Sequence, residues 1–390
     1  MKINVAVFFG GMSTEHEISC ISANQAMKAL DTDKYEIIPI YISKTNDLYT
    51  GDLLFDLANY YDLKELESKL DKVALYKDGN KAYIKSIKSS LFNKGIKTID
   101  VAFPVVHGSN IEDGSLAGYL EMLNIPYTSS NVLGSAVGQD KVIMKDILEK
   151  EDIDMVPWFT LYEDDLNDFD MILNKVNNLS YPLICKPANL GSSIGIEIIH
   201  NENELKEKLN ECFKYDFKVV VEKMITNLKE INISVMNIDG QAHVSVIEEV
   251  LKGDELLSFR DKYESGKKNS KTKLNGGSKG MASTDRIIPA NIDESMREKV
   301  EKMALKAYKV LNADGVVRID FMIDNDNNNV YLNEINNIPG SLAFYLWDKK
   351  DIDFSKECDI LINNAIKRFG KKEKKTYSFD TNILSNYRRK

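Results

Sequence analysis

The segment VVRIDFMIDNDNNNVYLNEIN (residues 316–336) contains two apolar stretches on either side of a run of Asn and Asp residues. This pattern predicts a β-hairpin. Side chains alternate between the two faces of a strand, so Arg318 and Asp320 share one face of the first strand. By the same rule, Glu334 and Asn336 share one face of the second strand. The hairpin is therefore expected to gather three oxygen-bearing side chains and one guanidinium in a single patch.

The residue types in this patch favour a hard divalent cation bound together with phosphates. Two carboxylates and an amide suit Mg²⁺, which keeps several waters and takes further oxygens from phosphate groups. A guanidinium cannot ligate a metal, but it can stabilise the negative charge that builds during acyl or phosphoryl transfer. A surface hairpin with ordinary ion pairs would show the same residues, so this pattern alone leaves both interpretations open.

Composition limits the class of protein. A chain of 390 residues with 43% apolar and 28% charged residues predicts a soluble globular protein of two or three domains. The longest apolar runs have only strand length, which predicts no membrane span. A net charge of −9 disfavours a nucleic-acid partner. The four cysteines form no CxxC pair, which favours reduced thiols in the cytoplasm over a structural zinc site.

The N-terminal third alternates strands and helices, which predicts a Rossmann-like domain with a parallel sheet over residues 1–141. Thr14 and Glu17 have the spacing of a capping box ahead of the first helix. Residues 44–98 are polar and lysine-rich, so we expect a peripheral insertion or an edge hairpin there. The expected strands cover residues 3–9, 35–43 and 100–106, and a further helix covers residues 112–123.

After about residue 142 the pattern becomes α+β with antiparallel pairing. The sequence predicts a central subdomain over residues 142–225, a C-terminal subdomain over residues 226–370 and a tail over residues 371–390. Asp239-Gly240 predicts a hairpin turn within the C-terminal subdomain. The expected strands are 181–187, 194–200, 217–225 and the hairpins 232–250 and 315–333, with helices at 201–213, 293–311 and 352–369.

A basic segment interrupts the C-terminal subdomain at residues 260–282. It has no apolar period, contains four glycines and carries mostly positive charge. A solvated face and a mobile lid over an anionic ligand both fit this composition.

Two further loops have residues suited to ligands. The stretch KPANLGSSIGI (residues 186–196) follows a strand, and its small residues let backbone N–H groups approach phosphate oxygens while Lys186 adds charge. It does not have the spacing of a Walker A loop. His107 follows another strand, at the edge where open α/β sheets bind ligands, although a single histidine is often structural.

The order of the motifs is more specific than any one of them. Along the chain come GGxSxEHExS, HGxxxEDG, QDK, KPxxxGSSxG, VVVE, KY, RIDF and NEINxxPG. Together they resemble the D-alanine–D-alanine ligase family of ATP-grasp enzymes over roughly residues 1–370. The resemblance implies a three-domain ATP-grasp architecture, mixed α/β and α+β, and dimers in most members.

The resemblance also implies roles for particular residues. Asp320, Glu334 and Asn336 match the ligands of two Mg²⁺ ions, for which Mn²⁺ can substitute. Arg318 and the N–H of Gly340 match the groups that stabilise the oxyanion of the tetrahedral intermediate. The remaining matches are Lys141, Lys186 and Lys262 for phosphate binding, Glu222 and Glu230 for adenine and ribose, Glu15, Ser192 and Tyr263 for a hydrogen-bonded set at the entrance, and His107 near the first amino acid.

The implied reaction joins two D-alanine molecules at the expense of ATP for peptidoglycan precursor synthesis in the cytoplasm. One carboxylate attacks the γ-phosphate to give an acyl phosphate, and the amine of a second amino acid then displaces the phosphate. A lid over residues 260–282 would exclude water, since hydrolysis of the acyl phosphate would waste ATP.

The chain departs from the family pattern at three places. Ile111 and Ala117 replace a Gly and a Gln of the HGxxGEDGxxQ motif, and the segment after Tyr263 is longer than usual. Tyr345 stands where a serine usually holds the carboxylate of the second substrate. A ligase that joins a different amino acid or small acid therefore stays open as an alternative.

Two other classes of protein fit less well. A nicotinamide-dependent Rossmann enzyme would need a GxGxxG loop, which the chain lacks. A non-catalytic nucleotide-binding regulator would be expected to lose Arg318 or a metal ligand, and these residues are present. Lys262-Tyr263 argues against a depsipeptide-forming relative, because such relatives generally lack this tyrosine.

Overall fold

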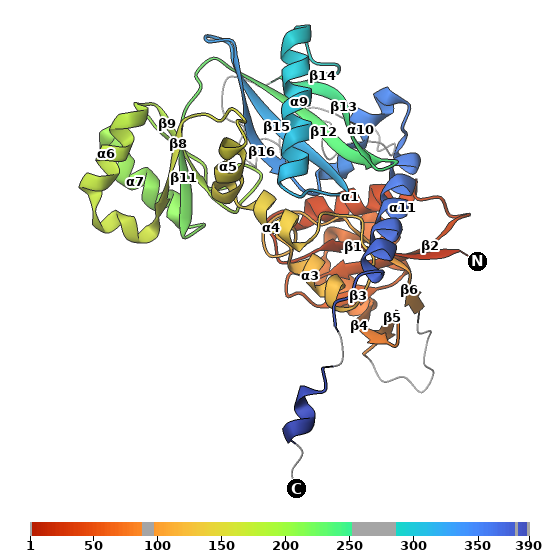
Figure 1. Ribbon diagram of the computed structural model, residues 1–390. Coiled ribbons are helices and arrows are strands. Elements are labelled where there is room, and N and C mark those ends of the chain that lie inside the picture. The colour runs from red at the N-terminus through yellow and green to blue at the C-terminus, as the bar shows by residue number, and fades with distance from the viewer. Residues whose placement is uncertain (1, 88–96, 252–285, 379–380, 388–390) are drawn as a thin grey trace.

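The computed structural model describes residues 2–87, 97–251, 286–378 and 381–387. Their strands form three sheets of seven, four and five strands. Figure 1 shows the first sheet below, the second with its helices α6 and α7 to one side, and the third above with α9 against it. The predicted basic segment 260–282, with Lys262 and Tyr263, lies outside the described residues.

The first sheet is mixed, whereas the sequence predicts a parallel one. Its strand order is β6-β5-β4-β3-β2-β1-β7, and only β1 with its neighbours β2 and β7 pairs in parallel. The edge hairpin predicted within residues 44–98 is confirmed by β4 and β5, since β3 to β6 extend one end of the sheet by antiparallel pairing. The strands are β1 (Ile3–Gly10), β2 (Tyr35–Ile42), β3 (Leu48–Thr50), β4 (Asp71–Asp78), β5 (Lys81–Ser86), β6 (Lys97–Ile99) and β7 (Val101–Pro104).

Helices α1 (His16–Ala29), α2 (Leu63–Lys69), α3 (Ser115–Met122) and α4 (Val132–Gln139) belong to this part of the chain. The predicted capping box at α1 is wrong. The N-cap of α1 is Glu15, and no side chain caps the helix. The carboxylate of Glu15 instead accepts a hydrogen bond from Ser192, in a loop of the second sheet. The predicted Thr14–Glu17 cap therefore does not form, and the Glu15 side chain makes a tertiary contact.

The second sheet has the order β10-β9-β11-β8, and β9, β10 and α7 lie where the sequence predicts strands and a helix. Apolar side chains of α6 and α7 pack on one face of this sheet. The opposite face carries Lys186 and Glu222 toward the third sheet. The elements are α5 (Lys141–Lys150), β8 (Trp158–Tyr162), α6 (Phe169–Leu179), β9 (Leu183–Pro187), β10 (Glu197–Ile199), α7 (Glu202–Phe213) and β11 (Lys218–Lys223).

The third sheet has the order β14-β13-β12-β15-β16 and confirms both predicted hairpins. Met296, Val300 and Ala304 of α9 lie in one apolar core with the inner side chains of β12 and β15. The elements are β12 (Leu228–Ile238), β13 (Gln241–Val250), β14 (Arg286–Ile287), α9 (Glu294–Val310), β15 (Val316–Asp324), β16 (Asn329–Asn336) and α10 (Phe344–Trp347).

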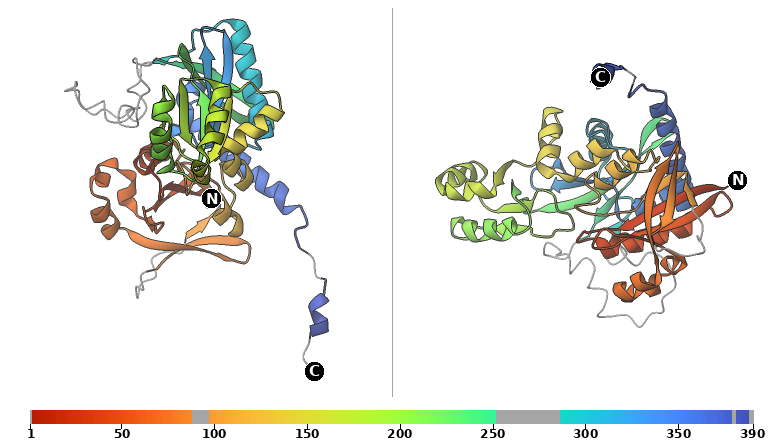
Figure 2. Two further views of the ribbon diagram at one scale, coloured as in Figure 1. Left: turned by 90° about the vertical axis from the view of Figure 1, so that its left-hand side faces the viewer. Right: turned by 90° about the horizontal axis from the view of Figure 1, so that it is seen from below.

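The last long helix, α11 (Phe354–Glu373), joins the C-terminal part of the chain to the first sheet. Cys358, Leu361 and Ile362 pack in the same core as β1 and β7. The helix runs into the predicted tail 371–390, and η7 (Ile383–Tyr387) stands apart from the rest of the chain in Figure 2. All four cysteines are buried and free. Among the described residues, no helix has the length and apolarity needed to cross a membrane.

Candidate active site

A cavity of about 860 Å³ lies where the three sheets meet. The first sheet contributes Glu15, and the loop after β7 contributes His107 and Glu112 to its lining. The second sheet contributes Lys186 and Glu222, with Gly191 and Ser192 from the loop between β9 and β10. The third sheet contributes Glu230, Asn232, Glu248, Arg286, Arg318, Asp320, Asn333, Glu334 and Asn336, followed by Gly340. Of the residues that the sequence analysis selects within the described ranges, all except Tyr345 line this cavity.

A row of polar side chains crosses the third sheet beneath the cavity. Glu248 of β13 pairs with Asn232 of β12, and Asn232 pairs with Asp320 of β15. Asp320 in turn pairs with Glu334 of β16. Directly opposed residues have Cβ atoms about 5 Å apart, so Asp320 and Glu334 are adjacent carboxylates, while Asn232 separates Asp320 from Glu248. The pairing of β15 with β16 confirms that the hairpin gathers the predicted patch.

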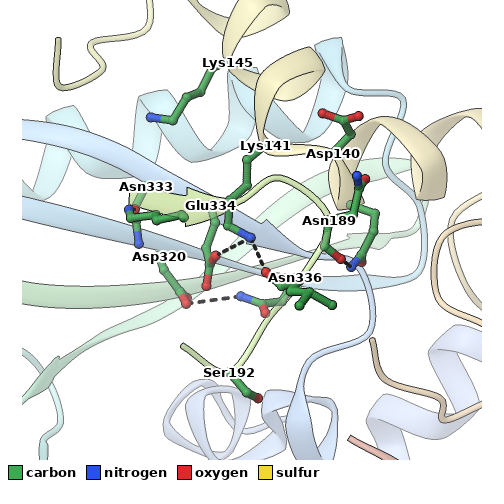
Figure 3. Close-up of polar contacts among 12 residues, drawn as sticks. Asp140, Lys141, Lys145, Asn189, Ser192, Asp320, Asn333, Glu334 and Asn336 are labelled. Carbon is green, nitrogen blue, oxygen red and sulfur yellow. Dashed lines mark hydrogen bonds and ion pairs between the residues drawn. The ribbon is translucent and has the colours of Figure 1, made fainter. Parts of the chain in front are cut away.

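Each carboxylate at the hairpin end of the row has a cationic or amide neighbour. Arg318 donates from Nε to Asp320 Oδ1 at 2.7 Å and from Nη2 to Oδ2 at 2.8 Å. Asn336 Nδ2 donates to Asp320 Oδ2 at 3.1 Å, as Figure 3 shows. Burial raises the pKa of Asp320, although the charge of Arg318 acts in the opposite direction. A divalent cation would therefore meet a carboxylate that is already held in a fixed orientation.

Lys141 links the carboxylate of Glu334 to the loop after β9, which the sequence predicts to bind phosphate. Its Nζ lies 3.3 Å from Glu334 Oε2 and donates to the carbonyl of Leu190 at 2.6 Å. Figure 3 shows Lys141 reaching from the start of α5 to Glu334. Among the described residues no three His, Cys, Asp or Glu side chains form a metal-binding group. The donor set that the sequence predicts, two carboxylates and one amide, would suit a cation that takes its other oxygens from water and phosphates.

The loop after β9 meets the first sheet at Glu15. Ser192 Oγ donates to Glu15 Oε1, and Ser192 has a positive φ of 53°. A Cβ on Gly191 would come within 3.1 Å of Glu15 Oε2, so only a small residue fits beside this carboxylate. Two of the three residues predicted for the entrance are therefore in contact, and the third, Tyr263, lies outside the described residues.

His107 supports the turn that contains Gly340. Its Nδ1–H donates to the carbonyl of Ile338 at 2.8 Å, and its Nε2 accepts from Ser22 Oγ at 3.0 Å. Ser22 Oγ also accepts the N–H of Ser341 at 3.0 Å. Burial lowers the pKa of His107 to about 4, so the ring is neutral at pH 7. His107 therefore holds the backbone on both sides of Gly340.

The turn after Gly340 needs this support because its backbone is strained. Ser341, Leu342 and Ala343 have φ values of 51°, 54° and 56°. A left-handed conformation costs an ordinary residue roughly 1–2 kcal/mol. Ser341 Oγ donates to Gln25 of α1 at 2.6 Å, which adds a second anchor. Strain of this kind persists where the surroundings fix it, and often at functional sites.

Glu112 is a site residue that the sequence analysis does not select, although it lies in the motif HGSNIEDG. Its Oε2 accepts the N–H of Gly108 and its Oε1 accepts the N–H of Ile338, both at 2.8 Å. Burial raises the pKa of Glu112 to about 8. Glu112 ties the loop of His107 to the turn of Gly340. Ile111 beside it is buried and packs near Gly11, so this departure from the family pattern adds to the core.

Three charged side chains form a buried group at the edge of the cavity. Glu222 Oε2 lies 2.6 Å from Lys186 Nζ, and Glu222 Oε1 lies 2.8 Å from Lys145 Nζ. Lys186 also donates to Asn333 Oδ1 at 3.0 Å. Glu222 is buried, but the two lysines lower its pKa to about 2. Lys145 is not predicted from the sequence, because a lysine one helical turn after Lys141 carries no motif signal of its own.

Tyr345 contacts the far end of the polar row. Its hydroxyl donates to Glu248 Oε1 at 2.8 Å, and Asn232 Nδ2 donates to the same oxygen at 3.0 Å. Arg286 Nη1 donates to Glu248 Oε2 at 3.1 Å, and its guanidinium lies 4.8 Å from the centre of the Tyr345 ring. The tyrosine hydroxyl is therefore engaged by a protein carboxylate. Phe344 stacks on Phe354, with ring centres 4.5 Å apart, as expected for a packing residue.

The chain is similar to known proteins over almost its whole length. Residues 4–130 match the family described as D-ala D-ala ligase N-terminus, and residues 147–363 match the family described as D-ala D-ala ligase C-terminus. The D-alanine–D-alanine ligase of Thermosipho melanesiensis is 40% identical over 386 residues, which are 98% of this chain and 98% of that protein.

Solved structures agree with these matches. The D-alanine-D-alanine ligase from Coxiella burnetii has a TM-score of 0.77 at 28% identity, covering 96% of each chain. The VanG D-Ala:D-Ser ligase from Enterococcus faecalis has a TM-score of 0.74 at 27% identity, covering 94% of this chain and 100% of that one.

Proposed function

The chain belongs to the D-alanine–D-alanine ligase family of ATP-grasp enzymes, and we propose that it joins two D-alanine molecules with conversion of ATP to ADP and phosphate. The observation that carries this proposal is the pairing of Asp320 with Glu334 beside Arg318. These groups share one cavity with Lys141 and Lys186. The cavity thus combines a cation site, lysines that can bind phosphates and a guanidinium that can stabilise an oxyanion.

The nucleotide fits the side of the cavity that lies between the second and third sheets. Lys141 and Lys186 supply positive charge there for the phosphates, and Lys262 would add to it. Glu222 and Glu230 are assigned to the adenine and ribose side. Asp320, Glu334 and Asn336 would hold two Mg²⁺ ions, or Mn²⁺, which neutralise charge on the phosphates when bound.

The first D-alanine supplies the carboxylate that attacks the γ-phosphorus of ATP, so that the bond to the bridging oxygen breaks, ADP leaves and an acyl phosphate forms. Glu15 would receive its ammonium, with Ser192 and Tyr263 as hydrogen-bonded partners and His107 behind it. The amine of the second D-alanine then attacks the acyl carbon, and the carbonyl oxygen gains negative charge. Arg318 and the N–H of Gly340 stabilise this oxyanion, and the phosphate leaves as the amide bond forms.

The identity of the second substrate has an alternative to D-alanine. Tyr345 stands where the family pattern has a serine, and its hydroxyl bonds to Glu248. A related solved structure is named a D-Ala:D-Ser ligase, so the family includes enzymes with another acceptor. We favour D-alanine because Glu15, Ser192 and Arg318 lie in one cavity, and retain a different amino acid or small acid as the alternative.

The same assignment places the enzyme in peptidoglycan precursor synthesis in the cytoplasm, as a homodimer. It also divides the chain into an N-terminal domain (1–141), a central subdomain (142–225) and a C-terminal subdomain (226–370). The cellular role and the dimer follow from the resemblance to the family, whereas the division follows from the change of strand pattern after about residue 142.

Phosphate release across a panel of D-amino acids, tested alone and in pairs, would examine the function directly. We expect ATP-dependent phosphate release with D-alanine alone and a D-alanyl-D-alanine product in the mass spectrum. A product that contains a different second residue, at higher kcat/KM, would favour the alternative acceptor. Absence of any dipeptide with D-alanine would contradict the proposed function.

A further inference from the structure

Lys145 is a fully buried cation that does not line the cavity. It is 0% exposed and projects from α5 one turn after Lys141, as Figure 3 shows. Its Nζ lies 2.8 Å from Glu222 Oε1, and 5.8 Å from the centre of the Trp158 ring. A charged lysine is among the residues least often found fully buried. Nothing in the proposed reaction requires Lys145 to touch a substrate.

A role as a simple stabiliser of the fold explains this residue poorly. Moving two charges out of water is costly, and well-packed apolar residues in place of a buried ion pair are often as stable or more so. Burial lowers the pKa of Lys145, in line with that cost. Glu222 already has a counter-ion in Lys186, 2.6 Å away. A second lysine is therefore not needed to compensate the charge of Glu222.

The charges of the group explain the second lysine better. With Lys145, the group contains two cations and one anion, so it has a net charge of +1. Without Lys145, Lys186 and Glu222 form a neutral pair. Lys186 lines the cavity and donates to Asn333 there, whereas Lys145 lies behind Glu222. The net positive charge is thus presented to the cavity through Lys186.

We propose that Lys145 is a positioning residue that compensates the charge of Glu222, so that the group presents a net positive charge to the phosphates of the nucleotide through Lys186. This inference rests on the proposed function, because it assumes that a nucleotide occupies this side of the cavity. It predicts that Lys145 strengthens binding of the nucleotide phosphates and does not change binding of the nucleoside.

The test compares the binding of MgATP and adenosine by calorimetry in three variants. Lys145→Met keeps the length of the side chain and makes the group neutral. Lys145→Met/Glu222→Gln restores the net charge of +1, since Lys186 is then the only charged member. Glu222→Gln alone reports any effect of position 222 on the nucleoside. Because adenosine lacks phosphates, its affinity separates an electrostatic effect from a change of pocket shape.

In Lys145→Met we expect the Kd of MgATP to rise about 10- to 100-fold, the range seen for residues that orient a direct ligand. The Kd of adenosine should stay within about twofold. The double variant should recover most of the affinity for MgATP after correction for its adenosine affinity. A merely structural lysine predicts no recovery, because the double variant has lost both ion pairs.

Three results would overturn the proposal: unchanged MgATP affinity in Lys145→Met, equal loss of MgATP and adenosine affinity, or a double variant as weak as the single one. If Lys145→Met does not fold, the double variant still decides, because the proposal requires its MgATP affinity, corrected for its adenosine affinity, to approach that of the wild type. Binding needs no turnover. Failure of the wild type to make dipeptide would therefore refute the proposed function separately, in the phosphate-release assay.

Discussion

At the scale of single residues, Glu334 shows how a strand register creates chemistry. The register of β15 and β16 pairs Glu334 with Asp320, and Lys141 of α5 lies 3.3 Å from the Glu334 carboxylate. Two carboxylates this close repel each other unless cations lie between or beside them. Lys141 pairs with Glu334 and Arg318 pairs with Asp320, so each carboxylate has a cation beside it. A divalent cation bound beside these two carboxylates would interact strongly with their negative charges.

We predict that Glu334→Gln lowers ATP turnover by at least about 10- to 100-fold, the loss that changing even a partner of a metal ligand causes, while the fold is kept because the shape of the side chain does not change. Phosphate release measures the turnover, and circular dichroism checks the fold. Asp324→Asn on the same hairpin, outside the cavity lining, is the matched control and should keep its activity. Activity of Glu334→Gln within about tenfold of wild type, roughly 1.4 kcal/mol, would exclude Glu334 as a ligand.

Tyr345 shows how a tertiary contact changes the meaning of a sequence position. A hydroxyl has one proton, and this one is donated to Glu248 at 2.8 Å. It cannot be donated to a substrate carboxylate at the same time. The sequence-based hypothesis that Tyr345 replaces the serine as a direct donor therefore requires this bond to break when substrate binds.

We predict that Tyr345→Phe raises the KM for the second D-alanine by less than about tenfold, because only the support of Glu248 is lost. Direct loss of a hydrogen bond to a charged group would cost about 1.5–3 kcal/mol, which exceeds tenfold. The dependence of rate on D-alanine concentration gives the KM of each substrate site. A larger rise confined to the second site would show that the hydroxyl binds the acceptor directly.

At the scale of elements, α4 joins the N-terminal domain to the third sheet. Gly134 lies so close to the end of α9 that a Cβ there would meet the carbonyl oxygen of Asn312 at 2.3 Å. The backbone carbonyl of Asn312 cannot move aside in the way that the end of a flexible side chain can. By contrast, a Cβ on Gly118 of the neighbouring α3 would meet only Val132, at 3.9 Å. Two helical glycines therefore differ in what they tolerate.

Gly134→Ala should lower the free energy of unfolding by about 1–3 kcal/mol, the usual cost of overpacking. Gly118→Ala should leave stability unchanged or raise it by up to about 1 kcal/mol, because alanine is the better helix former. Denaturant unfolding of both variants provides the comparison. Equal destabilisation by the two substitutions would contradict the close approach of α4 to the end of α9.

At the scale of the whole molecule, the cavity is built from all three sheets. A ligand that contacts all of them binds the folded chain and not the unfolded one, so it raises the stability of the entire molecule. The predicted metal site links the nucleotide to the third sheet, which makes this effect depend on the cation.

We predict that ATP and Mg²⁺ together raise the unfolding temperature, and that a chelator removes most of the rise. A ligand at 100 times its Kd adds about 2.7 kcal/mol to the free energy of unfolding. For a chain of this size the gain corresponds to a shift of several degrees. Differential scanning fluorimetry with ATP, Mg²⁺ and a chelator measures it. An equal shift with ATP in the presence of the chelator would argue against a cation bound by Asp320 and Glu334.

The sequence by itself determined the local features of this protein. Period-two alternation predicts the 316–336 hairpin and the shared faces of Asp320 and Glu334, because a hairpin pairs residues that are close along the chain. The order of the motifs identifies the family and many, though not all, of the residues that line the cavity. The local Asp239-Gly240 signal predicts the turn between β12 and β13.

The tertiary structure alone decided the features that depend on distant pairings. The β12–β13 and β12–β15 registers place Glu248 and Asn232 in the polar row. The packing of α5 against β11 brings Lys145 to Glu222. Glu15, the N-cap residue of α1, bonds to Ser192, which lies 177 residues further along the chain. The sheet at residues 44–98 pairs antiparallel strands onto a parallel core. The physical reason is common to all four: periodicity fixes which face a side chain occupies, whereas its partner is fixed by which elements share a core.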